Sequence, residues 1–383
     1  MHGTVTRRNG EHGQPATSMR VPRWLAPVAG VAGTILGLAT NLYSEEFRRA
    51  LTTSGHWLSS PVLSVLLVAM VASGSAIILY RLLVRRQVLH ELQLGEFPIG
   101  TDALQYIEDE HDSVVGRSLH YLEVKRDSPE LVVFLHGLGL DSEDFRPYMA
   151  ESKFHCIALT MFGFNTEERD DPHYKPISLK SHLQLLSYAL KKIRGDNPGK
   201  NITAVGFSFG ADVLLLLKRY AGDLVAGLDI ERAILLDPNV NHSTTTISSK
   251  VAALTAADPL DELVGILHSA RDVNDLGYLC NYLRKITSKN LDQVRRHASE
   301  VVDTWRVDGY DQFLDRVGQL TTIVGDVHII MSFSYEQQFN GMARAARDRG
   351  LDISNLDCSR SSHFDLITPR FLRDRLEGLL YAP

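Results

Sequence analysis

The chain has 383 residues, 44% hydrophobic and 22% charged, a balance typical of a globular protein and unlike a disordered or collagen-like chain. Its 40 Lys and Arg against 46 Asp and Glu give a net charge of −6, so no overall basic field indicates nucleic-acid binding. Cys156, Cys280 and Cys358 are too few and too scattered for a disulfide framework or a cysteine-based zinc site. The sequence indicates no oligomeric state.

Two uncharged stretches near the N-terminus predict membrane-spanning helices. They run from Trp24 to Ser44 and from Leu58 to Tyr80, and each reaches the ~20 residues that a helix needs to cross the hydrocarbon core. The second is rich in Leu, Val and Ile, whereas the first holds more Gly and Ala. We therefore expect a two-helix membrane anchor over residues 24–86, with the lipid bilayer as its partner. A buried or cleaved helix is the alternative.

Arginines flank this pair of stretches on its outer sides. Arg20 and Arg23 precede the first stretch and Arg85 and Arg86 follow the second, while the charges in the link between them cancel. Because Lys and Arg favour the cytoplasmic side, we expect both outer ends, and with them the rest of the chain, in the cytoplasm. The expected parts are a polar tail (1–23), the anchor (24–86), a connector of mixed helix and turn (87–117) and a large domain (118–383).

Within that domain, short apolar runs alternate with helical patterns. Leu131–Leu135 is wholly apolar, as in a strand buried on both faces, and Ser178–Ile193 places leucines along one helical stripe. This alternation predicts an α/β fold with a mostly parallel central sheet covered by helices on both faces. Further strands are expected at Leu119–Lys125, Phe154–Thr160, Ile202–Gly206, Ala233–Leu236, Val327–Met331 and Leu356–Cys358.

The residues Gly206-Phe207-Ser208-Phe209-Gly210 lie between an expected strand and an expected helix. In such a G-x-S-x-G turn the serine hydroxyl is exposed on a sharp bend, and side chains in place of the two glycines would collide with neighbouring backbone. The helix that follows directs its N-terminal N–H groups toward the same point, which favours a developing anion. Ser208 is thus the candidate nucleophile. A turn serine without chemistry is the alternative.

Several segments in order around this motif resemble the α/β-hydrolase superfamily over about residues 118–383. The stretch 131–149 is similar to the third strand and oxyanion loop of the family, and 361–367 to the loop that delivers its catalytic histidine. The resemblance implies that His136-Gly137 belong to the oxyanion loop, and that the backbone N–H groups of Leu138 and Phe209 stabilise an oxyanion.

His363 is the candidate base. It follows the last short strand, in the nucleophile–acid–histidine order that the family uses. A neutral imidazole in hydrogen-bond reach would take the serine proton during attack and return it to the leaving group.

The acid has two candidates. An ungapped match to the family pattern after the seventh strand places Glu336 at the acid position, with Phe333 where glycine is usual. Asp237 directly follows the sixth strand, where some branches of the family carry their acid, although Asp237-Pro238 is also an ordinary turn. Both residues remain open at this point.

Residues 239–326 occupy the place of a helical cap insertion in many relatives. Amphipathic pieces are expected at Leu260–Ala270, Asp275–Ile286, Leu291–Val302 and Tyr310–Leu320.

The sequence thus predicts a membrane-anchored serine hydrolase, an esterase, lipase or thioesterase, that cleaves a small-molecule or lipid acyl bond without metal or organic cofactor. The alternatives are a non-catalytic scaffold or signalling module with the same fold, and an acyltransferase using the same residues.

Overall fold

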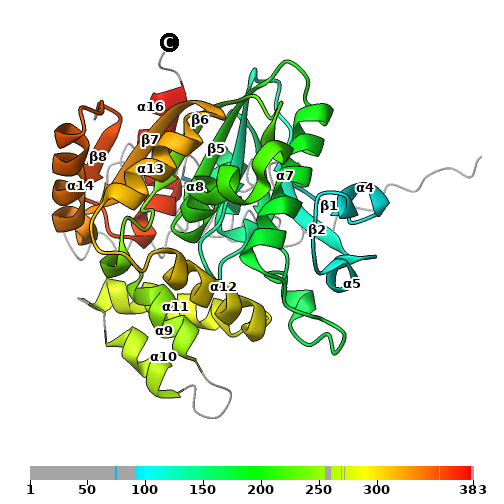
Figure 1. Cartoon of the computed structure of the whole chain (residues 1–383), viewed down its shortest axis with the longest axis horizontal. Coiled ribbons are helices and arrows are strands. Elements are labelled where there is room, and N and C mark those ends of the chain that lie inside the picture. The colour runs from blue at the N-terminus through cyan, green and yellow to red at the C-terminus, as the bar shows by residue number, and fades with distance from the viewer. Residues whose placement is uncertain are drawn as a thin grey trace, which may run out of the picture. The chain divides into compact units, whose positions relative to one another are not determined.

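The computed structural model describes residues 74–75, 92–254, 260–268, 270, 272–352 and 354–380 (Figure 1). Both predicted membrane stretches lie outside these ranges, apart from residues 74–75. Within the ranges, no helix has both the length and the apolar character needed to cross a bilayer. The chain divides into two compact units, Met1–Val84 and Arg85–Pro383, and all other described residues belong to the second.

The second unit is built on an eight-stranded sheet with the order β1-β2-β4-β3-β5-β6-β7-β8. Strand β2 is antiparallel to both of its neighbours, and the remaining pairs are parallel. Strands β3 and β4 are buried almost throughout, as their apolar runs predict. The strands are β1 (Leu92–Pro98), β2 (Ser118–Val124), β3 (Glu130–Leu135), β4 (His155–Thr160), β5 (Asn201–Phe207), β6 (Ile230–Leu236), β7 (Val324–Ser332) and β8 (Leu356–Ser359).

The sheet begins earlier than the sequence suggests. Strand β1 lies inside the expected connector, and its register with β2 runs from Leu92 opposite Val124 to Pro98 opposite Ser118. A strand that contains Gly95 and ends in proline has a weak local signal, and here the pairing with a distant segment decides its conformation. The compact domain therefore starts before residue 118.

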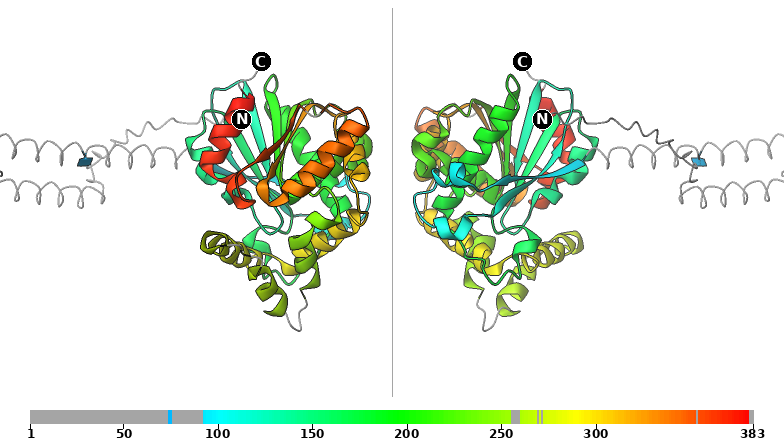
Figure 2. Two further views of the ribbon diagram at one scale, coloured as in Figure 1. Left: turned by 90° about the vertical axis from the view of Figure 1, so that its left-hand side faces the viewer. Right: turned by 90° about the vertical axis from the view of Figure 1, so that its right-hand side faces the viewer.

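Helices cover both faces of the sheet, which Figure 2 shows edge-on with the C-terminal helix and the α13–α14 region on opposite sides. On one face α8 packs against α7 and α13, and on the other α15 contacts α6. Helix α7 begins where the Ser178 side chain accepts a hydrogen bond from the Ser181 N–H. These helices are α6 (Arg146–Glu151), α7 (Leu179–Asp196), α8 (Phe209–Ala221), α13 (Asp311–Leu320), α14 (Glu336–Asp348), α15 (Pro369–Phe371) and α16 (Glu377–Leu380); α4 (Thr101–Leu104) and α5 (His111–Val114) follow β1.

Four helices between β6 and α13 form a separate group beyond one end of the sheet, here called the cap (Figure 1). Helix α9 contacts α10 and α12, and α10 contacts α11. The fourth piece expected in the cap, Tyr310–Leu320, forms α13 and does not join them, because its apolar residues Phe313, Leu314 and Leu320 are buried where it packs on α8. The cap helices are α9 (Thr246–Ala253), α10 (Leu260–Leu267), α11 (Val273–Ile286) and α12 (Leu291–Thr304).

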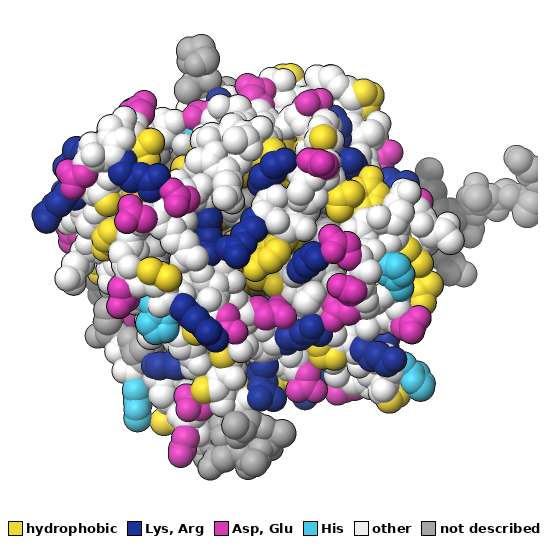
Figure 3. Space-filling model, viewed as in Figure 1, with side chains coloured by type: hydrophobic (Ala, Val, Ile, Leu, Met, Phe, Trp, Pro, Cys, Tyr) yellow, Lys and Arg dark blue, Asp and Glu magenta, His cyan; other side chains and the backbone are white. Residues whose placement is uncertain are grey.

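On the face of the molecule seen in Figure 3, basic and acidic side chains are interspersed. Ion pairs such as Arg117–Asp171 and Lys192–Asp102, at 2.8 and 3.0 Å, join side chains that are distant in sequence. Exposed pairs of this kind add little stability, so the fold depends mainly on its apolar core.

Candidate active site

Ser208 lies on a sharp turn between β5 and α8. Its backbone has a φ of 51°, a left-handed conformation that is unusual for a residue with a side chain. The Ser208 N–H donates to the Leu236 carbonyl at 2.8 Å, so the turn is tied to the end of the neighbouring strand β6. The buried strands and helix on either side hold the strained residue in place.

The two glycines of the motif leave no room for a side chain. A Cβ atom on Gly206 would come within 2.5 Å of the Gly210 oxygen, and one on Gly210 would overlap the backbone oxygen of Leu135. The collisions that the motif predicts for any side chain in place of these glycines would therefore occur in this structure. Since the clashing atoms are backbone, they cannot turn aside as a side chain could.

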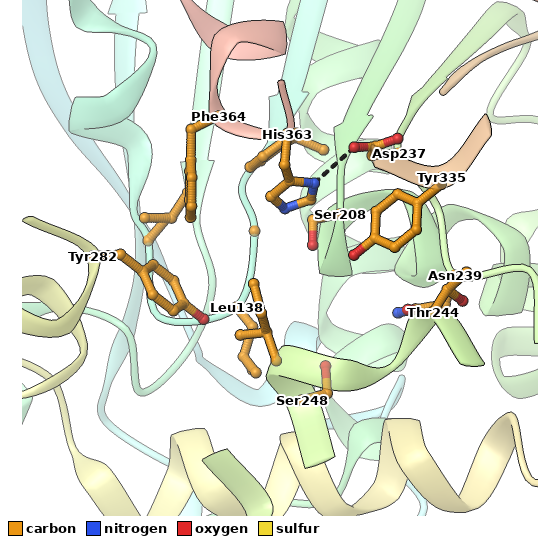
Figure 4. A pocket seen from close by; sticks show the side chains of 14 residues that line it. Leu138, Ser208, Asp237, Asn239, Thr244, Ser248, Tyr282, Tyr335, His363 and Phe364 are labelled. Carbon is orange, nitrogen blue, oxygen red and sulfur yellow. Dashed lines mark hydrogen bonds and ion pairs between the residues drawn. The ribbon is translucent and has the colours of Figure 1, made fainter. Parts of the chain in front are cut away.

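His363 and Asp237 form the other half of the site. The His363 Nδ1 lies 2.7 Å from the Asp237 Oδ2, and the Asp237 side chain is fully buried. A carboxylate can only accept, so Nδ1 carries the proton and Nε2 is left as the acceptor. Figure 4 shows the imidazole between Asp237 and Ser208, and all three residues line one pocket. Nε2 is the nitrogen available to take the Ser208 proton.

Backbone groups hold Asp237 in place. Its N–H donates to the Ile330 carbonyl at 2.9 Å, and its Oδ1 accepts from the Ser332 N–H at 2.6 Å. Its φ of 48° turns the chain sharply at the end of β6. One carboxylate oxygen is thus fixed by the end of β7, and the other is directed to His363.

Asn239, two residues after Asp237, is fixed by a buried carboxylate that the sequence did not predict. Asp212, on α8, accepts from the Asn239 N–H at 3.0 Å and from its side-chain amide at 2.5 Å. Burial raises the pKa of Asp212 to about 7. A single acidic residue in the apolar run of α8, four positions after Ser208, was the available signal.

The structure does not bring Glu336 to this site. Glu336 is exposed at the start of α14 and lines a separate hollow with Tyr310 and Arg344. Strand β7 continues to Ser332, and Phe333 begins a short 3-10 turn in place of the glycine turn that the ungapped match assumes. Of the two candidate acids, Asp237 is the one that contacts His363.

The loop after β3 holds the first expected oxyanion donor. The buried His136 ring accepts from the Met161 N–H through Nε2 at 3.0 Å, so its Nδ1 donates to the Gly137 carbonyl at 2.8 Å. Burial lowers the pKa of His136 to about 4, which keeps it neutral. In a trans peptide the Gly137 carbonyl and the Leu138 N–H point in opposite directions. Fixing the Gly137 carbonyl therefore fixes the direction of the Leu138 N–H.

The second expected donor, the Phe209 N–H, belongs to the first residue of α8. The first N–H groups of a helix have no acceptor within the helix, so this one is available to an anion beside Ser208. Leu138 lines the same pocket as Ser208.

A buried ion-pair cluster connects the oxyanion loop to the cap. Lys289, only 2% exposed, pairs with Asp141, and Lys285 of α11 lies 2.6 Å from Asp144. Asp141 directly follows this loop, and the Lys285 and Lys289 charges lower its pKa despite its burial. Gly139, with a φ of 75°, faces Ile286 of α11 so closely that a Cβ would overlap that side chain. The shape of the oxyanion loop therefore depends on the cap.

Helix α12 meets the core through a pair of buried histidines. The His297 Nε2 lies 2.8 Å from the His182 Nδ1 of α7, and the His297 ring lies against Phe209 with centroids 5.6 Å apart. Gln293 accepts from the Tyr174 hydroxyl at 2.8 Å. Burial lowers the pKa of both histidines. Charged groups flank this junction, since Glu300 lies 3.6 Å from the His297 Nδ1 and Arg296 pairs with Glu110 at 2.9 Å.

The pocket at Ser208 is small. Its free volume is about 20 Å³, little more than one water molecule needs. Its walls come from the strand ends, the oxyanion loop and the cap. The lining residues are Gly137, Leu138, Leu140, Phe207, Ser208, Asp237, Asn239, Thr244, Ile247, Ser248, Tyr282, Tyr335, His363 and Phe364.

In the described ranges, no group of three or more His, Cys, Asp or Glu side chains is arranged to hold a metal ion. Cys156 is buried, and burial raises the pKa of its thiol to about 12. That thiol is therefore not a competing nucleophile at neutral pH.

Residues 132–364 match the model described as the alpha/beta hydrolase family, and the chain belongs to this family. This agrees with the resemblance found in the sequence. No curated protein matches the chain.

Solved structures share the fold at low identity. One, AqDC, described in work on the recognition and ring-cleavage of the Pseudomonas quinolone signal, has a TM-score of 0.52 at 13% identity, over 70% of this chain and 97% of its own. A 1H-3-hydroxy-4-oxoquinoline 2,4-dioxygenase has a TM-score of 0.51 at 17% identity, over 70% and 98%. A structure from a study of carboxylesterases of Nitrososphaera gargenis has a TM-score of 0.48 at 14% identity, over 69% and 94%. At such identities the first two show the fold alone, so the reaction must be argued from the site.

Proposed function

We propose that this protein is a serine hydrolase that cleaves ester-type bonds, whether carboxylic ester, lipid ester or thioester, through an acyl-enzyme on Ser208. The observation that carries the proposal is the Asp237–His363 hydrogen bond beside a strained, glycine-flanked serine. A neutral imidazole with Nδ1 bonded to a buried carboxylate has Nε2 free to act as a base.

In the proposed reaction the Ser208 Oγ attacks the carbonyl carbon, and its proton passes to the His363 Nε2. The Leu138 and Phe209 N–H groups hold the oxygen that becomes negative. Collapse of the tetrahedral intermediate breaks the bond to the leaving alcohol or thiol, which takes the proton back from His363. A water molecule then gives a proton to His363 and attacks the acyl carbon. Collapse of this second tetrahedral intermediate releases the acid, and the Ser208 Oγ takes the proton from His363. The carboxylate of Asp237 stabilises the imidazolium at each stage.

Hydrolysis of p-nitrophenyl acetate by the full chain tests the proposal. We expect turnover by the native protein and a fall to the uncatalysed background in Ser208→Ala and His363→Gln.

His328→Gln is a matched control, because His328 forms a similar pair with Asp326 at 2.7 Å, on β7 and away from the pocket. This variant should keep its activity. No turnover by folded native protein, or equal turnover by Ser208→Ala, would overturn the proposal, and the former would favour a non-catalytic scaffold.

We further propose that the stretches Trp24–Ser44 and Leu58–Tyr80 anchor the protein in a membrane, with the hydrolase domain in the cytoplasm. The proposal is supported by their length, their lack of charge and the arginines on their outer sides. Resistance of the full chain to carbonate extraction from membranes, lost on removal of residues 1–86, is the expected result. Extraction of the full chain would contradict it.

A further inference from the structure

The pocket around Ser208 is lined by neutral hydroxyl groups from three separate elements. Ser248 comes from α9, Tyr282 from α11 and Tyr335 from the turn after β7. Figure 4 shows all three hydroxyls pointing into the space in front of Ser208. A cap built only to hold a long hydrocarbon chain would present apolar side chains there.

Among the residues that line this pocket, the charged side chain is Asp237, already bonded to His363 and to the Ser332 N–H. A carboxylate or phosphate on the substrate would lose its hydration here and meet no cation. Burying an unpaired charge is strongly unfavourable. The pocket therefore favours an uncharged group.

Tyr282 is the most informative of the three. It is 4% exposed, and no hydrogen bond to its hydroxyl is found among the described residues. Its ring lies against Phe364, with centroids 5.4 Å apart, and burial raises the pKa of the hydroxyl well above its usual value. A hydroxyl that faces the pocket without a partner in the described chain gains a hydrogen bond when a ligand supplies an oxygen. The hydroxyl stays neutral, so it can donate or accept.

The size of the pocket limits the acyl group. The acyl half stays attached to Ser208 after the alcohol departs, so it must begin in the space beside that residue. The free volume there is about 20 Å³, and α11 is fixed beside the oxyanion loop by the Lys285 and Lys289 pairs. A compact acyl group needs the least displacement of these side chains.

Resting on the proposed function, we propose that the acyl site selects compact, uncharged acyl groups that carry an ether, carbonyl or hydroxyl oxygen, and that the Tyr282 hydroxyl binds this oxygen. Ser248, on another cap helix, supports the same selection. Tyr282 is then a specificity-determining residue that takes no part in the chemistry at the carbonyl.

A pair of nearly isosteric esters tests the proposal. p-Nitrophenyl methoxyacetate and p-nitrophenyl butyrate differ by one oxygen in place of one methylene. The ratio of their kcat/KM values in the full chain, divided by the same ratio in Tyr282→Phe, cancels their intrinsic reactivities. We expect this selectivity to fall roughly 5- to 10-fold in Tyr282→Phe, the size of one neutral hydrogen bond.

Tyr278→Phe is the matched control. Tyr278 lies one turn earlier on the same helix, but its hydroxyl bonds to Asp365 at 3.1 Å and does not line the pocket. Its selectivity ratio should match that of the native protein.

Two results would overturn the inference alone: hydrolysis with an unchanged ratio in Tyr282→Phe, or a higher kcat/KM for p-nitrophenyl decanoate than for either short ester. Absence of hydrolysis of all three esters by folded protein would overturn the proposed function as well. A fluorophosphonate that labels Ser208 in Tyr282→Phe shows that this variant is folded and has a reactive serine.

Discussion

The two walls of the pocket differ in how their residues are held. On the sheet wall, Ser208 and Asp237 follow adjacent parallel strands and are fixed by backbone hydrogen bonds. On the cap wall, Tyr282 and Ser248 stand on helices of the cap, whose side chains contact the core, for example through the ion pairs of Lys289 and the histidine contact of His297. Backbone positioning gives a reactive geometry that many substrates could share. Because the cap is held by side chains, it is the part of the molecule in which substrate selectivity can vary and which can respond to pH.

The largest effect should come from the sheet wall. Asp237→Asn leaves the shape of the site intact but can stabilise the wrong tautomer of His363, and kcat for a simple ester should fall roughly 10³- to 10⁴-fold. Glu336→Gln, at the exposed start of α14, should stay within about twofold of the native value. Steady-state kinetics of both variants decide between the two acids that the sequence left open, and the opposite pattern would make Glu336 the acid.

Breaking the ion pair between Lys289 and Asp141 should reduce both the stability of the protein and its activity. Lys289→Met keeps most of the side-chain volume but leaves Asp141 buried without this partner, and we expect a loss of about 3 kcal/mol in the free energy of unfolding. Because Asp141 directly follows the oxyanion loop, kcat should fall more than KM changes. Urea unfolding and steady-state kinetics measure the two effects.

Arg306→Met, which removes an exposed pair with Asp303, is the control and should change stability by less than about 1 kcal/mol. Equal stability losses in the two variants would show that the cap is not held at Lys289.

A smaller loss is expected at the turn itself. Gly210→Ala places a methyl group against the Leu135 backbone oxygen, and overpacking of this kind costs about 2 kcal/mol. Gly195→Ala, on α7 where an added Cβ meets no atom within 4 Å, should be neutral or slightly stabilising. Thermal unfolding of the pair separates backbone crowding from a general effect of alanine, and a neutral Gly210→Ala would contradict the close approach.

The smallest effect, and the one specific to the histidine junction, is a change in pH dependence. Burial lowers the pKa of His182 and His297, so the unfolded chain binds protons that the folded chain does not. Stability is then fully present above the ordinary value of about 6.5 and is lost as pH falls below it. His136, with its pKa lowered to about 4, acts in the same direction.

In His182→Gln this loss between pH 7.5 and pH 5 should be smaller than in the native protein, as measured by urea unfolding. Asp212 and Glu168, whose pKa values burial raises to about 7, act in the opposite direction, and they are common to both proteins. Identical slopes for the two proteins would show that His182 does not contribute.

Local patterns were sufficient for the nucleophile of the sheet wall. The apolar run of β5, the G-x-S-x-G turn and the apolar start of α8 are contiguous, so Ser208 could be placed from ten residues. His363 followed from its position near the C-terminus and the resemblance to the family. The acid could not be placed by counting along the chain, because β7 ends in a 3-10 turn and Asp237 turns through a positive φ.

The cap wall was mostly hidden from the sequence. Its helices were expected from their amphipathic patterns, but such a pattern does not say what a helix packs against, as α13 shows. Lys289 and Asp141 are 148 positions apart, and each is of a residue type that is usually exposed at the surface. Only the folded chain buries them together. Tyr282 gave no signal either, since a tyrosine on an amphipathic helix is ordinarily part of the core.

Peptide mapping of the full chain after reaction with a fluorophosphonate tests the central claim most directly. The account predicts one phosphonylated peptide with the modification on Ser208. Labelling should decrease strongly in Asp237→Asn and should be absent in His363→Gln. Modification of another residue, or undiminished labelling of Ser208 without His363, would contradict the claim that this imidazole activates this serine.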